Sequence, residues 1–197
     1  MLAYLSWHRP ALTADPSAYE RALVQFHHSL AHRPPSGFRG SAVFRAAELP
    51  FLPEREPAPG DGAGYEDWYL LDDWAAVGVL EEAAVSTGHL SAHEKVASLA
   101  GPVTGAVYHL VEGHPDLLET RLAVWVQPAR EHSDPSLAAL LGDGMDPAGG
   151  GLWRRSLGLG PAPELCLLVP EVPAGVAPTR LPEGWSARTI SRERLAS

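Results

Sequence analysis

The sequence predicts an α+β fold made of two βαββ(α)β units in tandem. Two observations lead to this prediction. The first is the order of hydrophobic patterns in residues 1–112, which corresponds to strand, helix, strand, strand, helix and strand, the split βαβ arrangement. The second is that short motifs of residues 1–112 return in the same order within residues 120–192. We therefore expect a complete first unit in residues 1–112 and a shortened second unit in residues 120–192.

The first strand and the first helix have clear sequence signals. Leu2–His8 mixes apolar and aromatic residues, which is typical of a strand. Asp15 can accept a backbone N–H as an N-cap, and Pro16 suits the first helical position because no N–H is needed there. Together with apolar residues at spacings of four, three and four, these signals predict a helix over Pro16–His32. The apolar positions are Tyr19, Leu23, Phe26 and Leu30.

The remaining elements of the first unit follow from similar patterns. A loop over residues 47–64, rich in Pro, Gly and acidic residues, separates the second strand from the third. Asp72 or Asp73 can cap the helix that follows the third strand. The predicted strands are Phe38–Ala46, Tyr65–Leu71 and Thr104–Val111, and the predicted helical segments begin near Trp74 and His89.

The second half repeats motifs of the first. Asp15-Pro16-Ser17 matches Asp134-Pro135-Ser136, and each tripeptide follows a Leu-Ala pair, by thirteen residues in the first half and twelve in the second. The Pro-rich stretch 170–182 stands where a second helix would be, because proline cannot supply helix hydrogen bonds. Further matches in the same order are Phe38-Arg39 with Trp153-Arg154, Tyr65–Leu71 with Pro163–Val169, and Gly105–Val111 with Gly184–Ile190.

The order of predicted elements thus occurs twice, and the aromatic third strand Tyr65-Glu66-Asp67-Trp68-Tyr69 leads directly into a helix. This pattern resembles the dimeric α+β barrel superfamily in a fused tandem form. The resemblance covers most of the chain and depends on pattern rather than on a signature motif. It implies two ferredoxin-like units whose antiparallel sheets pack face to face as an α+β barrel, with the helices outside. The superfamily includes cofactor-independent monooxygenases, small isomerases and haem proteins related to chlorite dismutase, so the fold alone leaves the function open.

The composition excludes several classes of function. The net charge of −9 argues against bulk electrostatic binding of nucleic acid or of an anionic membrane. The single cysteine, Cys166, excludes a disulfide framework within the chain and a cysteine-based zinc site. No apolar stretch reaches the length of a membrane span, and no basic segment precedes a long apolar stretch at the N-terminus. We expect a cytoplasmic protein that is a monomer or a homodimer.

Among the nine histidines, His27 is the candidate for catalysis. It follows Leu23 by four residues and precedes Leu30 by three, so we expect it at the margin of the apolar stripe, beside a pocket between helix and sheet. There the imidazole could act as an acid/base or bind haem. The alternative is a boundary histidine with a local hydrogen bond. We expect replacement of His27 to reduce ligand binding or turnover more than replacement of His28 or His32.

Two histidine pairs have the i, i+4 spacing that can place two imidazoles on one metal ion, His28 with His32 and His89 with His93. The sequence His-Leu-Ser-Ala-His lacks the glutamate of the zinc-protease pattern, and the spacing identifies no third ligand. We therefore predict no metal site and no bound cofactor, with haem left open by the resemblance.

Aromatic side chains of the predicted strands supply the expected ligand pocket. Trp7, Trp68 and Tyr69 are the candidate walls for a flat organic ligand. The alternative is ordinary core packing, because aromatic residues suit strands and dominate core area. No dinucleotide fingerprint, Walker loop or Gly-x-Ser-x-Gly elbow accompanies them.

These observations leave two functions from different classes. The first is a small-molecule-binding barrel, acting as a cofactor-independent monooxygenase or isomerase, with His27 as acid/base and a small organic ligand as partner. The second is a non-catalytic barrel whose sheet faces serve packing or subunit association. Neither function involves nucleic acid or a membrane.

Overall fold

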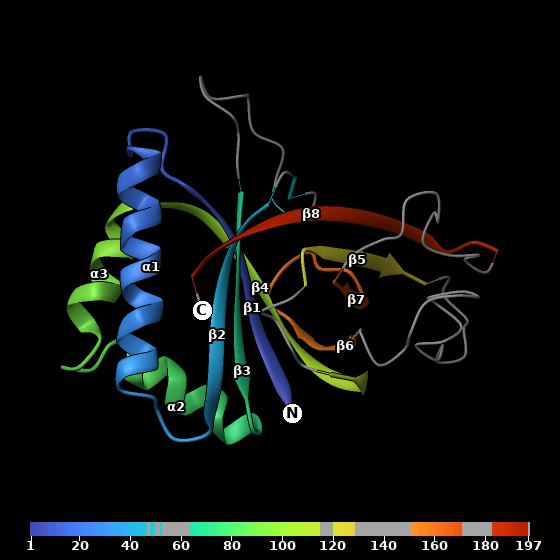
Figure 1. Cartoon of the computed structure of the whole chain (residues 1–197), viewed down its shortest axis with the longest axis horizontal. Coiled ribbons are helices and arrows are strands. Elements are labelled where there is room, and N and C mark those ends of the chain that lie inside the picture. The colour runs from blue at the N-terminus through green and yellow to red at the C-terminus, as the bar shows by residue number, and fades with distance from the viewer. Residues whose placement is uncertain are drawn as a thin grey trace.

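The structure, a computed structural model, describes residues 1–46, 48–49, 52, 64–114, 120–128, 151–170 and 183–196. Within these residues, eight antiparallel strands close into one barrel, and three helices lie together on one side of it (Figure 1). The helices are α1 (Pro16–His32), α2 (Trp74–Ala84) and α3 (Leu90–Leu99). The strands are β1 (Leu2–Pro10), β2 (Phe38–Ala46), β3 (Gly64–Leu71), β4 (Ala100–Gly113), β5 (Leu122–Gln127), β6 (Gly151–Gly158), β7 (Leu165–Val169) and β8 (Ser186–Ala196).

The barrel closes through two strand pairs that join the first half of the chain to the second. The strands are neighbours in the order β1-β3-β2-β8-β5-β7-β6-β4, and β4 pairs again with β1. The joining pairs are β2 with β8 and β4 with β6. The prediction of two ferredoxin-like sheets packed face to face is therefore wrong, since the structure has a single closed barrel. Edge strands carry unpaired N–H and C=O groups, and closure gives each edge a hydrogen-bonded partner.

The neighbour order nevertheless repeats within the barrel. It runs β4-β1-β3-β2 in the first half of the chain and β8-β5-β7-β6 in the second. Both halves contribute to the same wall, so the division into residues 1–112 and 120–192 remains a prediction.

The local elements of the first half agree with the sequence signals. Helix α1 spans Pro16–His32, as predicted, and the Asp15 carboxylate accepts hydrogen bonds from two N–H groups of its first turn. Asp73 caps α2 in the same way, by accepting from the backbone N–H of Ala76. Most of the predicted loop 47–64, the repeated tripeptide that begins at Asp134 and the Pro-rich stretch 171–182 lie outside the described residues.

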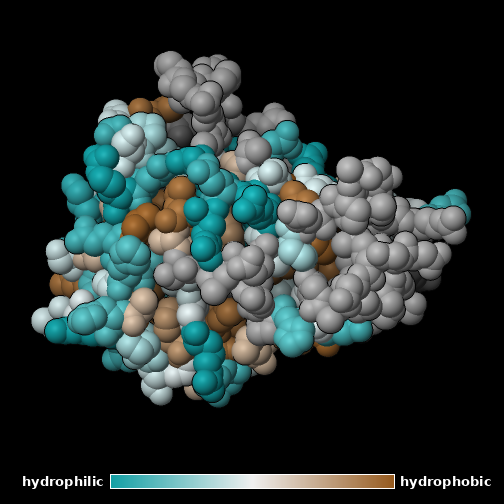
Figure 2. All heavy atoms as spheres, viewed as in Figure 1, coloured by the Kyte–Doolittle hydropathy of each residue, from teal (hydrophilic) through white to brown (hydrophobic). Residues whose placement is uncertain are grey.

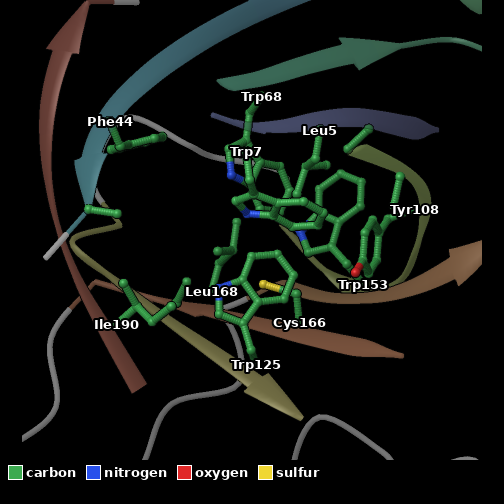
Figure 3. Close-up of a cluster of buried hydrophobic side chains, with 14 of the residues drawn as sticks. Leu5, Trp7, Phe44, Trp68, Tyr108, Trp125, Trp153, Cys166, Leu168 and Ile190 are labelled. Carbon is green, nitrogen blue, oxygen red and sulfur yellow. The ribbon is translucent and has the colours of Figure 1, made fainter. Parts of the chain in front are cut away.

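Tryptophan side chains fill the barrel interior (Figure 3). Trp7, Trp68, Trp125 and Trp153 come from four different strands, and each is at most 2% exposed. Trp7 and Trp125 meet edge to face, with ring centroids 5.3 Å apart, and Trp68 and Trp153 do so at 5.5 Å. Aromatic pairs of this kind add to the free energy of area burial, so they hold the two halves of the barrel together.

An ion pair lies among these rings. Glu66 Oε1 is 2.6 Å from Arg192 Nη1, and both side chains are fully buried. The Nε1–H groups of Trp7 and Trp68 donate to the two oxygens of the same carboxylate. Arg192 also donates to the backbone carbonyl and the hydroxyl of Thr120. The carboxylate from β3 and the guanidinium from β8 thus join strands of both halves inside the barrel.

The outer surface differs from this interior. On the face shown in Figure 2, the helical side is mostly hydrophilic, with smaller hydrophobic patches between the polar side chains. No helix in the part of the chain that the structure describes is both long and apolar enough to cross a membrane.

Replacing Arg192 with Leu is expected to lower the free energy of unfolding by about 3–5 kcal/mol, because the Glu66 carboxylate would stay buried without its counter-charge. Urea unfolding measures the change. The matched control is Arg188→Leu on the same strand, because the Arg188 side chain is 56% exposed and its Nη1 lies 3.7 Å from Glu48 Oε2. The Arg188→Leu change should lower the free energy of unfolding by less than about 1 kcal/mol. Equal losses in the two variants would contradict a special role for the buried pair.

Candidate functional site

Strand β3 places one carboxylate on each face of the barrel wall. Successive side chains of a strand point to opposite faces. Glu66 therefore points into the barrel, and Asp67 points out toward the helices, where it is 4% exposed. The register with the neighbouring strands places Ser6 of β1 and Val43 of β2 opposite Asp67. The helical layer thus covers a buried acid on the outer face of the wall.

Two histidines flank the Asp67 carboxylate. His8 Nε2, from β1, is 3.0 Å from Oδ2, and His27 Nε2, from α1, is 3.5 Å from Oδ1. His8 is 3% exposed and His27 is fully buried. Neither ring N–H is aligned for a hydrogen bond to the carboxylate, so both contacts are electrostatic.

Hydroxyl groups contact the Nδ1 atoms of both imidazoles, on the side of each ring away from Asp67. Tyr19 OH lies 2.7 Å from His8 Nδ1, and Ser41 Oγ lies 2.7 Å from His27 Nδ1. The result is a continuous polar chain from Ser41 through His27, Asp67 and His8 to Tyr19. Such contacts fix ring orientation and decide which nitrogen can carry a proton.

Burial and close partners determine the charges of the side chains in and beside this polar chain. Burial alone would raise the pKa of the Asp67 carboxyl, but its electrostatic attraction to the close imidazoles of His8 and His27 lowers it by more. The pKa of Asp67 therefore lies well below its ordinary value, and the carboxylate is ionised at neutral pH. Burial and then the charge of Asp67 raise the pKa of Tyr19 and of Tyr69 well above 10.0. Both phenols thus stay protonated, and Tyr69 OH donates to Asp67 Oδ2 over 3.1 Å.

A pocket of about 440 Å³ lies between this polar chain of side chains and the helices. Its volume falls in the range of sites for small organic ligands. The barrel wall contributes polar groups and a few small or apolar residues of β4 to its lining. The helices contribute apolar groups together with the phenol of Tyr19, an acidic side chain and an imidazole. None of the described lining residues is a lysine or an arginine. Its lining residues include Tyr4, Asp67, Tyr69, Leu80, Glu81 and His93.

The structure places the predicted site residues on two different faces of the wall. His27 is fully buried rather than at the margin of the stripe, and its ring stacks on that of Tyr69, with centroids 5.1 Å apart at 12°. Tyr69 itself lines the pocket. Trp7 and Trp68 lie on the other face, inside the barrel, where they bind Glu66. His27 and Tyr69 are thus brought together, and the two tryptophans are kept apart from them.

Sequence reasoning did not select His8, Asp67 or Tyr19. One signal was available, because Glu66 and Asp67 are adjacent acids in the aromatic strand Tyr65–Leu71. Alternation in a strand with both faces covered buries one acid on each side, and buried acids need partners. No comparable signal identified His8, whose partner lies across the sheet.

The structure gives no support for a metal or haem site in the described residues. No group of three potential ligands occurs among them. His89 Nδ1 lies 3.1 Å from Ser29 Oγ, and His93 lines the pocket. His27 does not fit an axial haem ligand, because Ser41 and Asp67 contact its two ring nitrogens.

Comparisons with known proteins show a likeness of structure and none of sequence. No protein-family model matches the chain, and no curated protein matches it by sequence. A crystal structure of an anthrone oxidase-like protein is similar over 100% of this chain and 94% of its own, with a TM-score of 0.52 and 11% sequence identity. At this identity the likeness shows a shared fold.

Asp67 should make the free energy of unfolding depend on pH in the acid range. Because its folded pKa lies below the ordinary value of 3.8, its contribution is present above that pH and is lost as the pH falls toward the folded pKa. We expect the free energy of unfolding of the Asp67→Asn variant to fall less steeply than that of the unchanged protein between about pH 5 and pH 2. Urea titrations across this range measure both slopes.

The variant Asp72→Asn, at an exposed site just after the same strand, controls for the general loss of one negative charge. Parallel curves for the unchanged protein and Asp67→Asn would show that the two imidazoles do not stabilise the carboxylate.

Proposed function

We propose that the protein is a cofactor-independent oxygenase that binds a flat, enolisable phenolic compound in the pocket between the barrel and the helices. One observation carries the proposal: the buried chain of Asp67, His8 and Tyr19 ends at a pocket lined by apolar and phenolic side chains. The fold likeness to an anthrone oxidase-like protein supports the choice of reaction class. The likeness is of fold, so the residues must supply the argument for chemistry.

The first step is removal of a proton from the substrate. Tyr19 lines the pocket and donates its own proton to His8 Nδ1 as its oxygen accepts the proton of the substrate. The raised pKa of Tyr19 means that the phenol passes a proton on and does not remain a phenolate. The positive charge then resides on His8, next to the Asp67 carboxylate at 3.0 Å. An orienting carboxylate that stabilises an imidazolium is a recurring device of base catalysis.

Dioxygen is the oxidant in the second step. The substrate anion adds dioxygen at the carbon that lost the proton, and the imidazolium of His8 returns that proton to the peroxide. Loss of the second proton from the same carbon with cleavage of the O–O bond gives a ketone and water. The sum is a CH₂ group and O₂ converted to a C=O group and H₂O. If the proton instead returned to another carbon of the substrate, the reaction would be an isomerisation and would consume no oxygen.

Anthrone is a suitable probe because it is flat and uncharged, its enol form is an aromatic hydroxyl compound, and it loses a CH₂ proton to give an aromatic oxyanion. We expect oxygen uptake in an oxygen electrode at one O₂ per anthrone oxidised. The variant Tyr19→Phe keeps the ring and removes the relay oxygen, and it should lower kcat about 100-fold. An unchanged rate in Tyr19→Phe would contradict the relay. Absence of both ligand binding and oxygen uptake would favour the non-catalytic barrel.

His27 is expected to act as a positioning residue, because it contacts Asp67 and stacks on Tyr69 without lining the pocket. The change His27→Gln should lower turnover about tenfold and shift its pH dependence, since one of the two imidazoles beside Asp67 is lost. His28→Gln alters an exposed neighbour on the same helix and should change neither quantity. Equal effects of the two variants would remove His27 from the site.

A further inference from the structure

We propose that the pocket selects uncharged aromatic hydroxyl compounds and rejects aromatic carboxylates, and that Asp67 at its floor and Glu81 at its mouth determine this choice. The inference deepens the proposed function, because it needs the pocket to bind a ligand, but it does not depend on which reaction follows.

The floor of the pocket presents an ionised acceptor. Asp67 lines the pocket, is 4% exposed and stays ionised at neutral pH. Tyr69 donates to its Oδ2, and the carboxylate has further lone pairs with which to accept a hydrogen bond. A ligand hydroxyl would donate to this carboxylate, and a ligand carboxylate would bring a second negative charge to the same place.

The mouth of the pocket carries a second acid. Glu81 lines the pocket from α2 and is exposed, whereas its neighbour Leu80 is buried in the helical layer. Glu81 is close enough to Tyr4 for its charge and hydrogen bonding, after burial, to raise the pKa of that phenol to about 12. The mouth is therefore formed by a carboxylate and a neutral phenol, and an anionic ligand is repelled where it enters as well as where it would bind.

No cation in the lining offsets these two acids. The charged or titratable groups facing the pocket are Asp67, Glu81, His8, His93 and three tyrosines, with no lysine or arginine among the described lining residues. Arginines on the neighbouring strand β2 have acidic partners away from the pocket, Arg39 with Asp72 and Arg45 with Glu20. Specific sites reject the wrong ligand by opposing it with like charge as well as by binding the right one.

Three naphthalene probes of similar size test the proposal by calorimetric titration. They are 2-naphthol, which is uncharged and donates a hydrogen bond, 2-methoxynaphthalene, which has no donor, and 2-naphthoate, which is an anion. We expect 2-naphthol to bind at least about tenfold more tightly than either of the others, because only it satisfies Asp67 without adding charge.

Two variants assign the selection to the two acids. The change Glu81→Gln should increase the affinity for 2-naphthoate about threefold, and by more at low salt. The affinity for 2-naphthol should stay within about twofold of that of the unchanged protein. Glu82→Gln is the matched control, since Glu82 is exposed on the same helix and does not line the pocket. The change Asp67→Asn should weaken the binding of 2-naphthol and remove most of the preference for 2-naphthol over 2-naphthoate.

The possible failures are distinguishable. If 2-naphthoate binds the unchanged protein as tightly as 2-naphthol, the charge selection is wrong, and the proposed function stands. If Glu81→Gln and Glu82→Gln behave alike, Glu81 has no part in selection. If none of the three probes binds, the pocket is not a site for such ligands, and the proposed function fails together with the inference.

Discussion

The structure depends on the alternation of side chains along β3. Two adjacent acids, Glu66 and Asp67, leave this strand on opposite faces, and both are buried. A buried carboxylate is stable only with close partners of opposite charge or with hydrogen-bond donors. Each face of the wall therefore needs its own polar network, and these two networks organise the barrel interior and the helical side.

On the inner face, Glu66 binds Arg192 from the last strand of the chain, together with two tryptophan N–H groups. This network joins the first half of the barrel to the second. On the outer face, Asp67 lies between His8 and His27, which come from the first strand and the first helix. The outer network borders a pocket, and the inner one is enclosed by aromatic rings. The same strand thus contributes to closure of the barrel and to the candidate site.

Local sequence signals predicted the parts that depend on neighbouring residues. The Asp15 cap, the proline that follows it and the apolar stripe predicted α1 with its bounds. The closed barrel was not predictable in this way, because pairing of β2 with β8 joins residues far apart in the sequence. His27 was selected by its spacing, but its partners come from β2 and β3, which spacing on one helix cannot reveal. Trp7 and Trp68 were grouped with Tyr69 as aromatic residues, although alternation along β3 separates Trp68 from Tyr69.

The central claim is that ligands bind on the helical side of the wall, next to Asp67. A crystal structure of the protein with 2-naphthol tests this most directly. The account predicts the naphthol ring in the pocket between β1, β3 and the helices, with its oxygen about 2.6–3.2 Å from an oxygen of the Asp67 carboxylate. Density for the ligand inside the barrel, beside Trp7 and Trp68, or on the surface away from Asp67, would contradict it.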